Sequence, residues 1–375
     1  MGLESIHFFR TMAGVFRYFL IFPLAWLVGC SSSPPPARQV TKVPEFPTPA
    51  AVTPTPPVPR RAEPEAPRIV VAPANPAESS YEFAGTWVSL ESWSQTNGLG
   101  SVSHAVTKSG NNYYLRASSG TLGISIGSQL AYWKGTQFWL GFGPQLINGR
   151  PYLHKLDVRK NVLPLLRPTA GLRAGGIIMI DPGHGGDQPG THSLVDKHFE
   201  KEYTLDWARR LKKILESGGW KVYLTRNGDQ DISRSNRVAL AEKAKADIFV
   251  SLHFNSSPHL EQSGIETYCT TPLGMSSSMT RGYEDDENVF VPNNTFDSLN
   301  FQFAMRLHQS LLEATGAVDR GVRRARFMTV LRAQKRPAVL IEGGYLSNAK
   351  EAKLIANPAH RQKMAEAVAR VLAPN

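Results

Sequence analysis

Short apolar runs alternate with longer segments of helical periodicity from residue 176 to the end of the chain. Strands are expected at 176–180, 222–224, 248–252, 265–268 and 339–341. Helices are expected from about Glu200 to a stop at 218–219, after a cap at Ser233, through 299–311, and after 357–358. Such alternation is typical of an α/β fold, because crossover helices return the chain to start the next parallel strand. The pattern predicts, for residues 174–375, a mostly parallel sheet with helices on both faces.

Four polar residues lie at the ends of these elements. His184, His253 and Glu342 each fall where an apolar strand ends, and Glu200 opens a helix. Sites in such sheets lie at the carboxyl ends of the strands, so we expect the four side chains to lie close together. Two imidazoles and one carboxylate can hold a zinc ion with a position open for water, and a further carboxylate such as Glu342 can take that water's proton. The sequence therefore predicts a metal-dependent hydrolase.

Other assignments stay open on the residues alone. His192, His198 and His259 are competing histidines, although they are placed on polar loops. Glu342 could instead cap a helix or pair with an arginine.

Several motifs in this region occur together in one known family. They are residues 180–186, Glu200-Lys201, 224–226 with Asp229, Arg237, 246–255 and 337–348. In this order they resemble the N-acetylmuramoyl-L-alanine amidases of the zinc-dependent cell-wall amidase family, over about residues 176–372. The resemblance implies that His184, Glu200 and His253 bind one zinc ion and that Glu342 is the catalytic glutamate. It also implies that the substrate is the amide joining the lactyl group of muramic acid to the L-alanine of the peptidoglycan stem peptide.

Two features depart from the family pattern. Gln188 stands where the family usually has Asp, next to the first ligand, so we expect altered hydrogen bonding around the ligand and retained activity. Thr270 to Asn294 is a long insertion-like stretch with an acidic run at 284–287. Some family members carry a segment here that covers the active site until an activator protein displaces it. The stretch is therefore a lid or an ordinary surface loop.

Arginines and one asparagine are candidates for contact with the substrate. Stem peptides carry carboxylates, which the planar guanidinium group suits. Arg323, in the cluster 320–326, and Asn255, within the motif that contains His253, are the predicted substrate-binding residues. For Arg226 and Arg237, structural salt bridges are the favoured role. Cys269 is expected to be a half-buried core thiol without chemistry.

Residues 78–168 are predicted to form a small β-rich accessory domain. Alternating runs at 113–115 and 138–140 are separated by turn signals at 97–98, 119–120 and 148–149. The stretch 139–153 loosely resembles the small N-terminal domain of copper amine oxidases. The tryptophans at 87, 93, 133 and 139 could line a glycan-binding face, but core positions are favoured for most of them.

The N-terminal region predicts export and anchoring. Basic residues precede an apolar stretch at 18–28, too short for a comfortable membrane span, and the junction at 27–30 resembles the bacterial lipoprotein signal, which makes 1–29 a signal peptide and Cys30 the lipidated residue. An ordinary cleaved signal or a short membrane anchor is the alternative. Ser31 after Cys30 favours the outer membrane, facing the periplasm. Residues 30–77 are Pro-rich and are expected to form an extended disordered tether.

Taken together, these features predict a lipid-tethered periplasmic zinc amidase that acts on peptidoglycan. The net charge of +11 fits either an acidic partner or a generally basic surface. No motif for nucleic acid or nucleotide binding is present. The alternatives are a non-catalytic peptidoglycan-binding scaffold and a zinc peptidase that acts on stem peptides.

Overall fold

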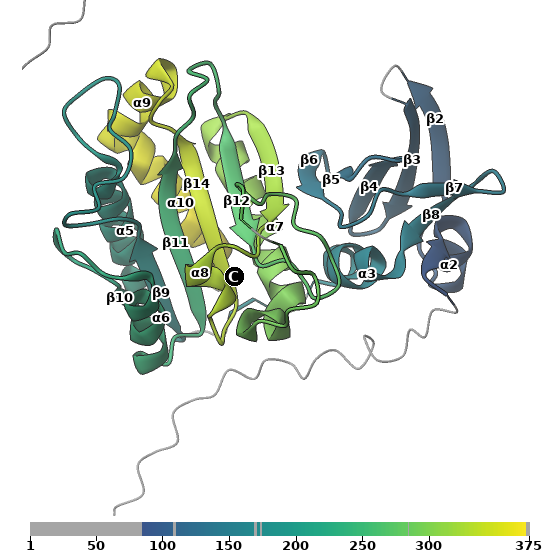
Figure 1. Cartoon of the computed structure of the whole chain (residues 1–375), viewed down its shortest axis with the longest axis horizontal. Coiled ribbons are helices and arrows are strands. Elements are labelled where there is room, and N and C mark those ends of the chain that lie inside the picture. Colours follow the sequence, from purple (N-terminus) through teal and green to yellow (C-terminus); the bar gives the residue numbers. More distant parts are fainter. Residues whose placement is uncertain (1–84, 108–109, 169–170, 173–174, 284, 373–375) are drawn as a thin grey trace, which may run out of the picture. The chain divides into compact units, whose positions relative to one another are not determined.

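The computed structural model describes residues 85–107, 110–168, 171–172, 175–283 and 285–372, all within the compact unit Glu65–Asn375 (Figure 1). The predicted signal peptide, Cys30 and the Pro-rich linker lie outside the described residues. Among the helices that are described, none combines the length and the apolar character needed to cross a membrane.

The C-terminal region consists of strands alternating with helices. Its strands are β9 (Ile177–Pro182), β10 (Lys221–Leu224), β11 (Ile248–Asn255), β12 (Ile265–Cys269), β13 (Asp319–Arg324) and β14 (Ala338–Tyr345). Its helices are α5 (Glu200–Ser217), α6 (Arg234–Lys243), η2 (Pro292–Phe296), α7 (Asp297–Thr315), α8 (Thr329–Arg332), α9 (Ala349–Ala356) and α10 (Pro358–Leu372). As predicted, the Ser233 side chain caps α6 by accepting a hydrogen bond from the Asn236 amide, and Gly316 ends α7 in a left-handed conformation.

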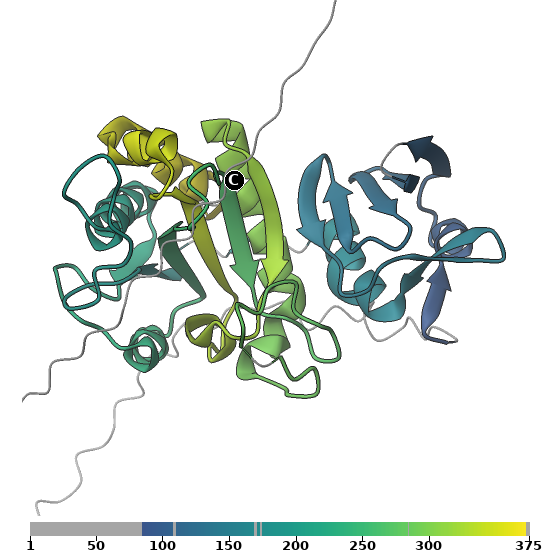
Figure 2. The same cartoon turned by 45° about the horizontal axis from the view of Figure 1, so that its top comes forward.

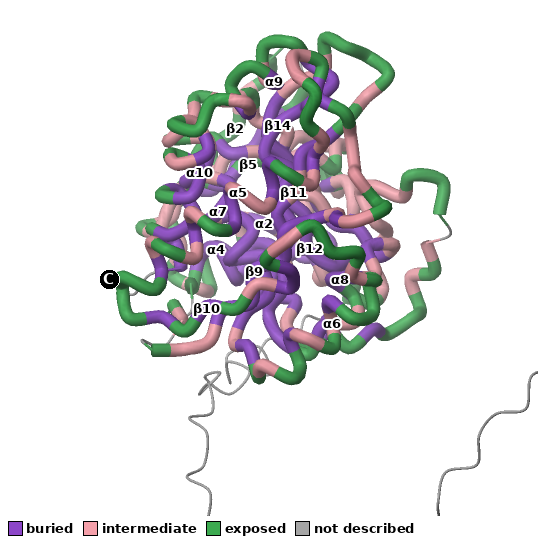
Figure 3. The backbone as a smooth tube through the Cα atoms, turned by 90° about the vertical axis from the view of Figure 1, so that its left-hand side faces the viewer, coloured by how far each residue is buried: buried purple, intermediate pink, exposed green. Residues whose placement is uncertain are grey.

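Helices cover both faces of this part of the sheet (Figure 2). The larger core packs α5, α7 and α10 on one face, and the smaller core packs α6 and α8 on the other. The strands between them form a buried interior, shown in purple in Figure 3. The predicted α/β class is therefore confirmed.

The strand order in this region is β10-β9-β11-β14-β12-β13. Neighbouring strands are parallel, except that β12 pairs with β14 in the antiparallel direction. The exception has a simple cause, because residues 256–264 join β11 to β12 without the crossover helix that a parallel return needs.

The N-terminal described segment contains an antiparallel meander. Its elements are β1 (Trp87–Ser89), α2 (Leu90–Thr96), β2 (Val102–Thr107), β3 (Gly110–Ala117), β4 (Gly120–Ser125), β5 (Leu130–Trp133), β6 (Thr136–Trp139), β7 (Gln145–Ile147), β8 (Arg150–His154), α3 (Lys155–Asp157), η1 (Val158–Val162) and α4 (Leu163–Leu166). Asn148 and Gly149 form the β7–β8 turn with positive φ angles of 49° and 75°, as the turn signal predicted. Asn97, by contrast, ends α2 and makes no strand turn. Trp93 and Trp133 are buried core residues.

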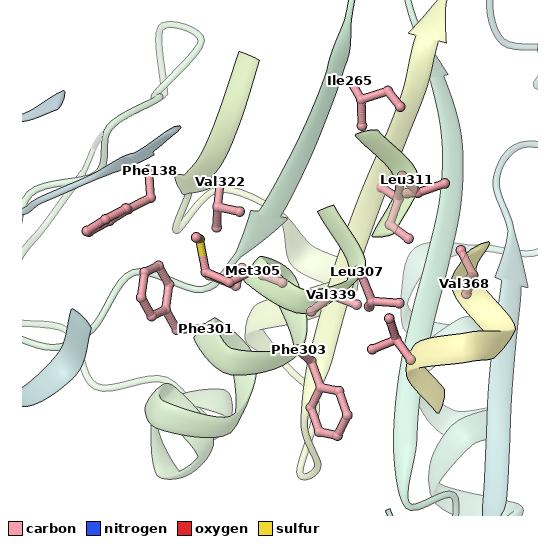
Figure 4. Close-up of a cluster of buried hydrophobic side chains, with 14 of the residues drawn as sticks. Phe138, Ile265, Phe301, Phe303, Met305, Leu307, Leu311, Val322, Val339 and Val368 are labelled. Carbon is pink, nitrogen blue, oxygen red and sulfur yellow. The ribbon is translucent and has the colours of Figure 1, made fainter. Parts of the chain in front are cut away.

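The two segments share one sheet, which was not expected. The 11-stranded order continues from β13 into β6-β5-β4-β3-β2, with Val322 of β13 paired in parallel to Phe138 of β6. Phe138 packs edge-on against Phe301 of α7, with ring centroids 5.4 Å apart (Figure 4). The Gln137 amide also donates a 2.8 Å hydrogen bond to Asp319. Apolar and polar contacts therefore hold the N-terminal strands against the C-terminal ones.

Candidate active site

The turn after β9 positions His184. His184 has a φ of +62°, an uncommon conformation for a residue other than glycine. Arg237 holds this turn, since it donates to the Asp181 carboxylate at 2.6 Å and to the His184 carbonyl at 2.8 Å. Arg226 donates to the Gly183 carbonyl at 2.7 Å. The ion pair predicted for Arg237 is present, whereas Arg226 binds backbone carbonyl groups.

The imidazoles of His184 and His253 converge on Glu200 at the start of α5. His184 Nε2 lies 3.1 Å from Glu200 Oε2, and His253 Nδ1 lies 2.9 Å from Glu200 Oε1. One ligand atom from each residue lies within 4.8 Å of the others. Space beside the histidines is tight, because a Cβ atom at Gly183 would come within 2.2 Å of His253 Cε1. Three separate elements thus bring together the three residues that the sequence singled out as ligands.

Charge interactions within this triad are strong. Burial acts to raise the pKa of Glu200, but hydrogen bonds from His184 and His253 outweigh it and lower the pKa below its ordinary value. Burial acts to lower the pKa of His253, but the hydrogen bond and charge of Glu200 outweigh it and raise the pKa. Glu200 is therefore an anionic carboxylate, the form that binds a metal.

Glu342 lies beside the triad on the neighbouring strand. It pairs in register with His253 across β11 and β14, and it is only 6% exposed. Burial is the main cause that raises its pKa to about 7, while the charges of His253 and Arg281 act in the opposite direction. Glu342 Oε2 is buried and has no hydrogen-bond partner among the described residues. A buried oxygen without a partner is unusual in a protein, and a general base needs a free one.

The competing histidines lie elsewhere. The side chains of His198 and His259 are 59% and 75% exposed and face Asp196 and Glu261, respectively. His192 packs its ring edge-on against Phe199. In the described part of the chain, His184, Glu200 and His253 form the one group of three or more residues that could hold a metal.

A buried carboxylate that the sequence reading did not single out organises the next strand. Glu266 of β12 is 2% exposed and pairs in register with Glu342. It accepts hydrogen bonds from Arg320 Nε at 2.8 Å and Asn255 Nδ2 at 3.2 Å. The side-chain amide of Asn255 therefore contacts Glu266, and its role in substrate binding stays a prediction. The signal was available, because an acidic residue in the middle of an apolar strand needs a buried partner.

The arginine cluster divides into two groups. Arg320 and Arg323 lie near Glu266, with Arg323 Nε 3.5 Å from Glu266 Oε1. Arg324 donates to the Thr270 carbonyl and to Asn161. Arg326 donates to backbone carbonyls of the 270–294 stretch. Arg323 therefore remains the candidate for substrate contact within the cluster.

The two departures from the family pattern have local roles. Gln188 exchanges backbone hydrogen bonds with Gly185, and its side chain donates to Asp231 at 3.2 Å. In the stretch 270–294, of which Glu284 lies outside the described residues, Asp285 pairs with Arg326 and Met275 is buried. Whether this stretch is a lid stays a prediction.

Cys269 is fully buried, and this burial raises the pKa of its thiol. The side chain was expected to be half-buried, so its burial was underestimated.

The residues present fit a divalent metal. Two imidazoles and one carboxylate face a common centre and can bind a tetrahedral zinc ion while leaving a fourth position open. The Glu342 oxygen without a hydrogen-bond partner lies beside His253, on the adjacent strand β14.

Comparisons with known proteins decide the family. Residues 178–373, just over half of the chain, match the family described as N-acetylmuramoyl-L-alanine amidase. The chain belongs to the N-acetylmuramoyl-L-alanine amidase family. The predicted resemblance over residues 176–372 is thereby confirmed.

Individual relatives of this amidase-family chain match it in part. The N-acetylmuramoyl-L-alanine amidase AmiC of Escherichia coli is 30% identical over 240 residues, covering 57% of this chain and 57% of the relative. AmiC of Neisseria meningitidis is 32% identical over 237 residues, covering 57% and 55%. The chain thus spans about half the length of these relatives. The solved catalytic domain of the amidase CwlV of Bacillus (Paenibacillus) polymyxa is 32% identical with a TM-score of 0.43, covering 52% of this chain and 94% of that one.

Proposed function

We propose that this chain hydrolyses the amide bond between N-acetylmuramic acid and L-alanine in peptidoglycan, during cell-wall turnover or cell separation. One observation carries the proposal. A buried carboxylate with a free oxygen, Glu342, lies in register with His253 of a two-histidine, one-carboxylate metal triad. Membership in the family supports the choice of substrate.

Each residue then has a role. His184, Glu200 and His253 hold one zinc ion, which when bound would polarise the substrate carbonyl and acidify a water molecule. Glu342 takes a proton from the attacking water as its oxygen bonds to the lactyl carbonyl carbon. As the C–N bond breaks, Glu342 returns the proton to the nitrogen of L-alanine, which leaves as a free amine. A pKa of about 7 suits a group that must both accept and release a proton near neutral pH.

Digestion of purified peptidoglycan by the zinc-loaded full chain tests this reaction, with the released fragments identified by mass. Stem peptides that begin with L-alanine are expected. Release of shortened stem peptides would show that the chain is a peptidase and not an amidase. Binding to peptidoglycan without release of any product would show that the chain is a non-catalytic scaffold. Glu342→Gln is the matched control, since it keeps the shape of the side chain and should retain zinc while losing turnover.

Location and partners form a second part of the proposal. We propose a periplasmic enzyme anchored by lipid at Cys30, at the outer membrane, with peptidoglycan and an activator protein as its partners. Labelled fatty acid should be incorporated into the full chain expressed in a bacterium and should be lost with Cys30→Ser. Equal labelling of the unsubstituted chain and of Cys30→Ser would contradict lipid attachment at Cys30.

A further inference from the structure

One face of the shared sheet carries a row of functional side chains. His253, Glu342 and Glu266 are register partners on β11, β14 and β12. On the next strand, Arg323 of β13 is the register partner of Tyr268. Because side chains alternate along a strand, Glu266 and Tyr268 point to the same face, and the row continues onto β13.

The row ends on a residue of the accessory segment. Val322 and its partner Phe138 point to the opposite face, into the core beside α7 (Figure 4). Their sequence neighbours Arg323 and Trp139 therefore share the face of the metal triad. The guanidinium carbon of Arg323 lies 4.0 Å from the centre of the Trp139 ring. The accessory strand thus reaches the same surface as the catalytic residues.

The chain is built for this close approach. Gly321 precedes Arg323 on β13 with a φ of +84°, and a Cβ atom there would come within 2.4 Å of the Trp139 ring. A side chain larger than hydrogen would push the ring away. The guanidinium group is consequently packed against an indole ring, a contact that limits its rotation and orients its N–H donors.

Charge at this end of the row is unbalanced. Glu266 is one carboxylate between two guanidinium groups, those of Arg320 and Arg323. The Arg323 side chain is only 12% exposed, and its Nε has no hydrogen-bond partner among the described residues. Arg281 adds a third positive charge on this face, 6.0 Å from the centre of the Tyr268 ring. The Nε of the neighbouring Arg324 also lacks a hydrogen-bond partner among the described residues, but its two terminal nitrogens donate to backbone and side-chain oxygens. The surplus positive charge therefore fits an anionic group of a ligand.

We propose that Arg323 and Trp139 form a subsite for a carboxylate of the stem peptide, so that the accessory segment completes the substrate site. The proposal rests on the amidase function proposed above. Strands lie about 4.8 Å apart, so β13 is roughly 10 Å from Glu342 on β14, a span of about three extended residues. The recognised carboxylate lies about that far beyond the amide that is cut. Trp139 holds the Arg323 fork and covers the apolar side of the peptide.

The test measures selectivity for the carboxylate by calorimetry. The full chain carrying Glu342→Gln and loaded with zinc should bind muramyl tripeptides without cutting them. A tripeptide with free carboxylates should bind about 10-fold more tightly than the same tripeptide with amidated carboxylates, as expected for a charge-assisted hydrogen bond. Adding Arg323→Gln or Trp139→Ala should bring this ratio close to one, and Trp139→Phe should restore part of it. Tyr132→Ala, on the neighbouring strand, is the matched control and should keep the ratio.

Several results would overturn the subsite. The first is an affinity ratio near one in the chain that carries only Glu342→Gln. The second is a loss of affinity in the Arg323 and Trp139 variants that is equal for both tripeptides, since an equal loss indicates a structural role. Thermal unfolding of each variant identifies any that fail to fold, and Trp139→Phe then carries the test. The amidase proposal fails separately, if the unsubstituted chain releases no peptide beginning with L-alanine while the binding ratio persists.

Discussion

Replacing Glu342 by glutamine should stabilise the metal-free protein, by an amount that grows with pH. Burial raises the pKa of Glu342 from its ordinary 4.5 to about 7. The folded state therefore holds the proton more tightly than the unfolded state. The resulting stability is fully present below about pH 4.5 and is lost as the pH rises through about 7. Glutamine does not titrate, so the variant does not lose stability in this window.

The magnitude follows from the two pKa values. Between about pH 5 and pH 8, the free energy of unfolding of Glu342→Gln should rise relative to the parent chain by about 2.5 kcal/mol. Urea unfolding of chelator-treated protein at several pH values measures this difference. Glu261→Gln is the control, because the Glu261 side chain is 82% exposed and its replacement should give no such trend. A difference between Glu342→Gln and the parent that stays constant across this range would refute the assigned burial of Glu342.

Further substitutions test the triad and the turn that carries it. His253→Ala should leave the purified chain nearly free of zinc by elemental analysis, with its circular dichroism unchanged; full zinc content would contradict its role as a ligand. Gly183→Ala should weaken zinc binding in competition with a chelator, because the added methyl group would collide with the His253 ring; unchanged affinity would show that the ring can shift. Arg237→Met should lower the free energy of unfolding by about 3 kcal/mol, because it leaves the buried Asp181 carboxylate without its charged partner. Arg332→Met, at an exposed position, is the matched control and should change stability little.

Much of the C-terminal region could be predicted from the sequence, because local signals and tertiary structure agree there. The apolar run before His184 is a buried strand, and Ser233 and Gly316 begin and end helices as their chemistry favours. The convergence of His184, Glu200 and His253 followed from a general property of parallel sheets, whose strand ends meet at one edge.

The rest depended on contacts between distant parts of the chain. Nothing local in β6 indicates that Phe138 pairs with Val322, almost two hundred residues later, so the shared sheet was not foreseen. Strand β12 is antiparallel to β14 because no crossover helix precedes it. Hydrophobic periodicity predicts where strands lie but not their direction, so this pairing was not predicted. The hydrogen bond from Asn255 to Glu266 could not be foreseen, because Glu266 lies on another strand.

The central claim is that His184, Glu200 and His253 together hold one zinc ion beside Glu342. Anomalous diffraction from crystals of the zinc-loaded chain, recorded on both sides of the zinc absorption edge, tests it most directly. We predict one strong peak bonded to all three side chains, at about 2.0–2.2 Å from each ligand atom. No peak there, or a peak held by other residues, would contradict the account.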